Sequence, residues 1–104
     1  MKLFISGYIS NCPEKLNAFE LANNINEATD VLILPGGLGT FSDLFKSVND
    51  GKRVIVYNKD LFYTPIIEKL FKLYEEGIEL RKPFEYMEIE SELDNIISKL
   101  EERL

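Results

Sequence analysis

Apolar residues along the chain follow two alternating patterns, one typical of buried strands and one typical of helices. Short apolar runs without polar alternation lie within 2–6, 31–34 and 53–57, as expected for strands that are buried on both faces of a parallel sheet. A weaker run in 83–89 is interrupted by acidic residues, which predicts an edge strand.

Between and after these runs, apolar residues recur three and four positions apart, which is the spacing of one buried helix face. The pattern predicts helices over 11–27, 40–49, 64–77 and 91–104. Asn11 and Ser91 each stand three positions before an acidic residue, as in a capping box, while Gly51 and Gly77 predict helix ends. This alternation predicts an α/β fold, a Rossmann-like parallel sheet of about four strands alternating with helices, in a single domain over residues 1–104.

The second predicted strand runs directly into a glycine-rich segment, PGGLGT at 35–40, and a helix follows. Gly36, Gly37 and Gly39 lack a Cβ atom, so their backbone N–H groups can approach a ligand closely. With Thr40 as the predicted N-cap, these N–H groups and the positive end of the helix dipole form a site for an anion. Phosphate is the first ligand that we expect there.

Three further residues belong to this predicted site. Ser6 ends the first strand and Gly7 follows it, at the edge where open α/β sheets bind ligands, although an ordinary turn would explain them equally well. Asp43 is either a carboxylate of the site or part of a helix cap with Thr40. A cap leaves the three glycines ahead of Thr40 unexplained, so a ligand is favoured.

Composition and charge narrow the possible partners. The net charge of −6 and the pI near 4.7 argue against a nucleic-acid partner, which needs clustered Lys and Arg. The sequence has no apolar run near the ~20 residues of a membrane span and no signal-peptide pattern, so we expect a cytoplasmic protein away from membranes. Histidine is absent and Cys12 is the single cysteine, which excludes a zinc site and a Ser-His nucleophile. We expect no metal and no cofactor.

The segment 35–40 followed by Asp43 resembles the PGGxGTxxE signature of the LOG (Lonely Guy) family of nucleoside 5′-monophosphate phosphoribohydrolases. The resemblance continues through GKRVIVYNKDLFYTPIIEKL at 51–70 and covers residues 28–104. It implies that Gly36, Gly37, Gly39 and Thr40 hold the phosphate of a nucleotide. It also implies that Asp43 lies beside the ribose and assists cleavage of the N-glycosidic bond to the base.

The chain departs from that family in ways that bear on catalysis. Family members carry an Arg-Lys pair on the helix before the motif strand, and the Arg takes part in catalysis, but AFELANNINEAT at 18–29 contains neither residue. The chain also lacks strand and helix units that family members have before this point, and Asp43 replaces a glutamate. Three interpretations therefore remain open: a phosphoribohydrolase, a nucleotide-sensing module without turnover, and a structural or partner-binding module.

A second resemblance leads to the same kind of ligand. The opening MKLFISG, the later GT followed by Asp43, and GKRVIVY at 51–57 are also similar to nucleoside 2-deoxyribosyltransferases, which use a Glu nucleophile. The PGG element favours the LOG family. Both families act at the bond between base and sugar, so we expect a small-molecule nucleotide or phosphate as the ligand.

The apolar strands also raise the question of what covers the second face of the sheet. Sequential strand order would place the first three helices on one face. The C-terminal helix, a reversal in strand order or a second copy of the chain would then cover the other. We favour a homodimer, in which Arg53 or Arg81 of one subunit could supply the missing cation to the other.

Overall fold

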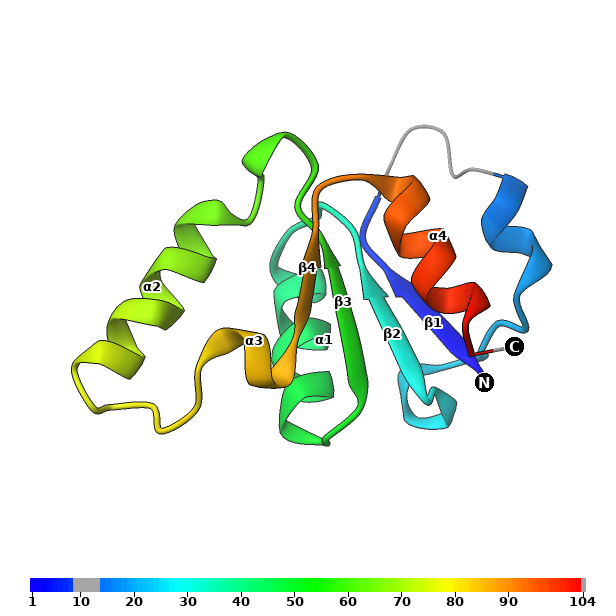
Figure 1. The fold of residues 1–104 in the computed structure, drawn as a ribbon. Helices are drawn as coiled ribbons and strands as arrows, with labels where there is room; N and C mark the ends of the chain where they lie inside the picture. The colour runs from blue at the N-terminus through cyan, green and yellow to red at the C-terminus, as the bar shows by residue number, and fades with distance from the viewer. Residues whose placement is uncertain (9–13, 104) are drawn as a thin grey trace.

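The computed structural model describes residues 1–8 and 14–103, with the backbone alone for residues 14 and 15. Its centre is a parallel sheet of four strands in the sequential order β1-β2-β3-β4 (Figure 1). The strands are β1 (Leu3–Ser6), β2 (Asp30–Ile33), β3 (Arg53–Tyr57) and β4 (Glu88–Glu90). The predicted α/β fold with a parallel sheet is confirmed.

The helices lie on both sides of this sheet. α1 (Leu38–Asn49) lies behind the sheet in Figure 1, and α4 (Leu93–Glu101) crosses its front. α2 (Thr64–Glu75) extends sideways beyond the edge strand β4, and the single turn α3 (Pro83–Tyr86) leads back into that strand. Three 3₁₀ turns, η1 (Glu14–Ala18), η2 (Ile25–Glu27) and η3 (Lys59–Leu61), complete the elements of the described residues.

Side chains that alternate along the strands fill two apolar clusters, one on each face of the sheet. The front cluster joins Leu32 and Ile55 to Ile96 and Leu100 of α4. The rear cluster joins strand residues to α1, and its buried members are Ala28, Val31, Ile33, Leu44, Val48, Val54, Val56, Tyr63 and Met87. Asp30 to Ile33 are buried along the whole of β2, as the unbroken apolar run predicted.

The predicted helix over 11–27 is wrong over its described part. The chain there forms η1 and η2, and residues 20–22 pair with β1: Leu3 N–H donates to the Glu20 carbonyl, and Ala22 N–H donates to the Leu3 carbonyl. The Asn24 side chain accepts from the backbone N–H groups of Asn26 and Glu27, so it competes with helical hydrogen bonds. The predicted helix start at residues 11–13 lies outside the described residues.

Two smaller predictions also need correction. Residues 83–86 of the predicted strand over 83–89 form α3 instead, because Pro83 suits the first turn of a helix, and the strand is only Glu88–Glu90. Ser91 does not cap the last helix, since Glu92 occupies the N-cap position without a side-chain bond. The helix ends predicted at Gly51 and Gly77 are confirmed, and both glycines have a positive φ.

The structure removes our sequence-based reason for a homodimer. α4 covers the second face of the sheet, and Leu16 and Phe19 of the N-terminal segment pack into the same front cluster. The strands are therefore covered on both faces within one chain. Among the described residues, no helix is long and apolar enough to cross a membrane.

Candidate functional site

The glycine-rich turn lies at the carboxyl edge of the sheet, between β2 and α1 (Figure 1). α1 begins at Leu38 with Gly37 as its N-cap, so the predicted N-cap role of Thr40 is wrong. Thr40 lies in the first helical turn instead, where its side chain is buried and packs against Gly36. Asp43 lies in the second turn, so it is not part of a helix cap either.

Gly7 brings the end of β1 against this turn. Its φ of 105° is one that L side chains rarely adopt, and a Cβ atom there would lie 2.5 Å from the Leu34 carbonyl oxygen. The next residue, Tyr8, donates its N–H to the Pro35 carbonyl at 2.8 Å. Only glycine permits this contact between the β1 end and the glycine turn.

Ser6 and Asp43, far apart in the sequence, meet beside the turn. The Ser6 Oγ donates to Asp43 Oδ2 at 2.6 Å, and the Ser6 side chain is buried. This hydrogen bond fixes the carboxylate of α1 above the end of β1, and hydrogen bonds to charged groups are among the stronger ones. The structure thus brings together two of the predicted site residues.

The glycines of the turn differ in what the surrounding structure requires of them. A Cβ atom on Gly36 would collide with the side chain of Thr40, so packing explains this glycine. Gly37 and Gly39 have no atom within 4 Å of the position of a Cβ, and neither has a positive φ. The space above these two residues is open.

The backbone N–H groups of residues 36–40 have no acceptor among the described residues. The first hydrogen bond of α1 comes after them, from Phe41 N–H to the Gly37 carbonyl at 3.0 Å. Unpaired N–H groups at the start of a helix are ordinary donors for an anion.

The loop after β3 supports the turn from beneath. Tyr63 is buried and donates its hydroxyl to the Leu34 carbonyl at 2.5 Å, while its N–H donates to Asn58 Oδ1 at 2.7 Å. Burial raises the pKa of Tyr63 to about 12. Tyr63 is therefore part of the scaffold and not a surface on which a base could stack. The sequence favoured a core position for Tyr63 over base stacking, but it did not predict the hydrogen bond to Leu34.

The same loop also shapes the surface beside the turn. Asp60 and Leu61 have φ angles of 52° and 62°, an unusual conformation for a branched apolar residue such as leucine. Strained backbone of this kind is common at functional sites. Leu61 and Phe62 are exposed there, at the end of β3 that adjoins the glycine turn.

The charges at this edge are mostly acidic. Lys59 is the sole basic residue among the described loop residues that follow the four strands, whereas Asp60 and Glu92 are acidic. Burial, followed by the charges of Glu92 and Asp60, raises the pKa of Tyr57. A bound phosphate would therefore depend mainly on backbone N–H groups.

The amino edge of the sheet holds the arginine that we considered as a substitute cation. Arg53 Nε donates to Glu88 Oε2 at 2.7 Å, and its Nη1 lies 3.5 Å from Asp30 Oδ2. Arg103 Nη2 lies 3.1 Å from Asp30 Oδ1, and Lys99 pairs with Glu88 and Glu90. Hydrogen bonding to Arg53 holds the pKa of Glu88 below its usual range, despite the opposing effect of burial. Arg53 is therefore committed to neighbouring carboxylates at the far edge from the glycine turn.

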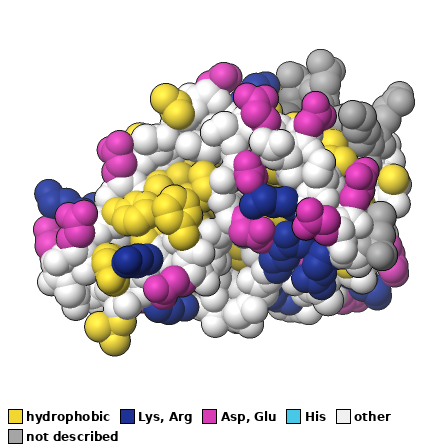
Figure 2. Space-filling model, in the orientation of Figure 1, with side chains coloured by type: hydrophobic (Ala, Val, Ile, Leu, Met, Phe, Trp, Pro, Cys, Tyr) yellow, Lys and Arg dark blue, Asp and Glu magenta, His cyan; other side chains and the backbone are white. Residues whose placement is uncertain are grey.

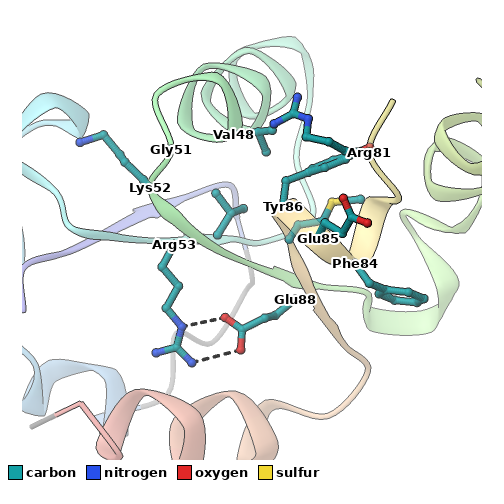
Figure 3. A pocket seen from close by; sticks show the side chains of 11 residues that line it. Val48, Gly51, Lys52, Arg53, Arg81, Phe84, Glu85, Tyr86 and Glu88 are labelled. Atoms are coloured by element: carbon teal, nitrogen blue, oxygen red, sulfur yellow. Dashed lines mark hydrogen bonds and ion pairs between the residues drawn. The ribbon is translucent and has the colours of Figure 1, made fainter. Parts of the chain in front are cut away.

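A pocket of about 270 Å³ also lies near the amino edge, between the end of α1 and α3 (Figure 3). Val48, Tyr86 and Phe84 contribute to its walls, and the side chain of Arg53 points away from them toward Glu88. Arg81 lies over the Tyr86 ring at 5.0 Å from its centroid and pairs with Glu79. None of the predicted site residues lines this pocket.

Comparison of the chain with models of known protein families gives no match, and comparison with curated proteins gives none either. The candidate site therefore rests on the motif and on the geometry of the carboxyl edge.

Proposed function

We propose that the protein binds a nucleoside monophosphate, with the phosphate on the backbone N–H groups of residues 36–40. The proposal draws on the LOG-like motif and on the arrangement of the carboxyl edge. The unpaired N–H groups, the Ser6–Asp43 pair and the end of β1 all lie at this edge. Asp43 then lies on the sugar side of the phosphate, as the motif implies.

The observation that carries the proposal is the open space at Gly37 and Gly39. Glycine in a helix costs about 1 kcal/mol relative to alanine, so a glycine without a structural need calls for another explanation. Neither backbone conformation nor packing requires glycine at position 39, whereas Gly37 is the N-cap of α1, a position where glycine is common. Close approach of a ligand to the backbone does require glycine at position 39.

Substitution of Gly39 by alanine tests the proposal without disturbing the fold. The added methyl group meets no protein atom, but it would occupy the space of the phosphate. We expect Gly39→Ala to fold at least as well as the wild type. In a calorimetric titration its affinity for AMP should be lower by a factor of about ten or more. Asn49→Ala, at the exposed end of the same helix, is the matched control. Equal affinity in all three proteins would reject the phosphate site.

Cleavage of the N-glycosidic bond is a second candidate function, favoured by the position of Asp43. A carboxylate can stabilise the oxocarbenium-like transition state of such a reaction and activate water. The Ser6 hydrogen bond holds this carboxylate in one orientation beside the glycine turn. The family's catalytic Arg has no counterpart in 18–29, so binding without turnover is the primary proposal.

A product assay separates the two candidates. The protein is incubated with a panel of nucleoside monophosphates, and the release of free base and ribose 5-phosphate is followed. Release that is lost in Asp43→Asn would establish the hydrolase. Binding of a nucleotide without release of base would leave a nucleotide-sensing module.

A further inference from the structure

α2 differs from the other helices in how little of it the chain covers. α1, α3 and α4 each contain buried residues, whereas α2 contains none. Ile66 and Ile67 in its first half, and Leu70 just past its middle, pack against the rear cluster. The second half extends beyond the sheet (Figure 1). We call residues 61–86 the α2–α3 arm.

The arm carries a surface of large apolar side chains. The rings of Phe71 and Phe84 meet edge to face, with their centroids 5.3 Å apart. Phe84, Ile78 and Leu80 are 66%, 69% and 86% exposed. At about 150–200 Å² for a large side chain, these three residues expose on the order of 400 Å² of apolar surface. Figure 2 shows hydrophobic side chains gathered between α2 and β4.

Charged side chains surround the apolar surface of the arm. The arm has four Lys or Arg and five Asp or Glu, a net charge of −1 out of −6 for the whole chain. Arg81 and Lys82 lie over the rings of Tyr86 and Tyr74, which places basic groups at the border of the apolar surface.

We propose that the α2–α3 arm is the interface of a homodimer, with the arms of two copies packed against each other about a two-fold axis. A standard interface buries about 800 Å² per partner, of which roughly 450–500 Å² is apolar. The exposed apolar side chains of the arm, together with the half-buried Phe71, Leu73 and Tyr74, match that requirement.

The pocket near the amino edge of the sheet adjoins the apolar surface of the arm. Phe84 belongs to the exposed apolar surface and also lines the pocket of Figure 3. A side chain of the second copy can enter this hollow, as large side chains do at the centre of stable interfaces. This interface lies away from the glycine turn, so the dimer does not depend on the proposed nucleotide site.

Sedimentation at tens of micromolar tests the dimer and its location. The chain has a mass of 12.0 kDa, and we expect the wild type to sediment at twice this mass. Leu80→Glu and Phe84→Glu place a charge in the interface, and each should weaken the dimer about tenfold or more. Leu38→Glu is the matched control, because Leu38 is as exposed as Leu80, at 86%, but lies at the start of α1.

Each outcome of the sedimentation experiment either supports or overturns the proposed interface. A wild-type dimer that Leu80→Glu and Phe84→Glu dissociate, and that Leu38→Glu leaves intact, supports the proposal. Leu80 is largely in solvent, so its loss should not affect the far-ultraviolet circular dichroism of the protein. A monomeric wild type would overturn the proposal, and so would a dimer that only Leu38→Glu dissociates.

Discussion

The two edges of the sheet use polar residues in opposite ways. At the amino edge, Arg53 forms ion pairs with both Asp30 and Glu88, and Lys99 and Arg103 from the C-terminal part of the chain join this network, in which the buried Asp30 Oδ2 has no hydrogen-bond partner among the described residues. At the carboxyl edge, the Ser6–Asp43 pair lies beside backbone N–H groups that have no acceptor among the described residues. Polar groups that neutralise each other stabilise a fold, whereas polar groups left open in a structured turn are available to a ligand.

The same contrast applies to the glycines. Gly7 is required by its backbone conformation and by contact with Leu34, so it is a structural residue at the border of the site. Gly37 and Gly39 are required by neither. Substitutions can therefore separate what holds the carboxyl edge together from what keeps it open.

The largest effect that we expect is on stability, from Gly7→Ala. The new methyl group would collide with the Leu34 carbonyl, and φ would stay strained, at a combined cost of about 3 kcal/mol in the free energy of unfolding. Gly51→Ala is the control, because Gly51 also has a positive φ but no neighbouring atom, and it should cost about 1 kcal/mol. Urea denaturation measures both. Equal losses would mean that the contact between β1 and the glycine turn is not tight.

At the amino edge, Arg53→Met should destabilise the fold by about 2 kcal/mol, because it leaves the buried Asp30 with fewer cationic partners. We expect the affinity for AMP to stay unchanged, since Arg53 lies at the opposite edge. The measurements are urea denaturation and a calorimetric titration. A large loss of AMP affinity in a folded variant would contradict the division between the two edges.

The smallest effect concerns pH. The pKa of Glu88 is lowered in the folded protein, chiefly by its hydrogen bond to Arg53, so its contribution to stability is present above the ordinary Glu pKa of about 4.3. This contribution is lost as the pH falls from there through the lowered pKa. Since Glu88 is about one third exposed, we expect its contribution to the free energy of unfolding to be under about 1 kcal/mol. Glu88→Gln should therefore flatten the acid limb of a plot of unfolding free energy against pH. An unchanged acid limb would mean that the ion pair adds nothing to stability.

The apolar pattern was sufficient to predict the parallel sheet, because strands buried on both faces leave continuous apolar runs such as 31–34. It failed over 14–27, the described part of the helix predicted for 11–27, where helical spacing is present but the Asn24 side chain and the pairing of 20–22 with β1 favour another conformation. Long-range backbone pairing leaves no mark on local periodicity.

The site shows the same division between local and long-range information. The glycine turn could be predicted because the strand, the glycines and the helix are consecutive. The Ser6–Asp43 bond and the support of the turn by Tyr63 depend on contacts between residues far apart in the sequence. Thr40 was misplaced as an N-cap because its residue type suits that position, whereas the helix begins two residues earlier.

The most direct test of the nucleotide site is an NMR titration of the wild-type protein with AMP and with inorganic phosphate, followed through the backbone amide signals. We predict saturable shifts at Gly37, Gly39 and Thr40 with both ligands, because both carry the phosphate that the unpaired N–H groups would bind. AMP should also shift Asp43 and the residues after β3. Shifts confined to Arg81, Tyr86 and other residues of the amino-edge pocket, with Gly37, Gly39 and Thr40 unchanged, would contradict the proposed site.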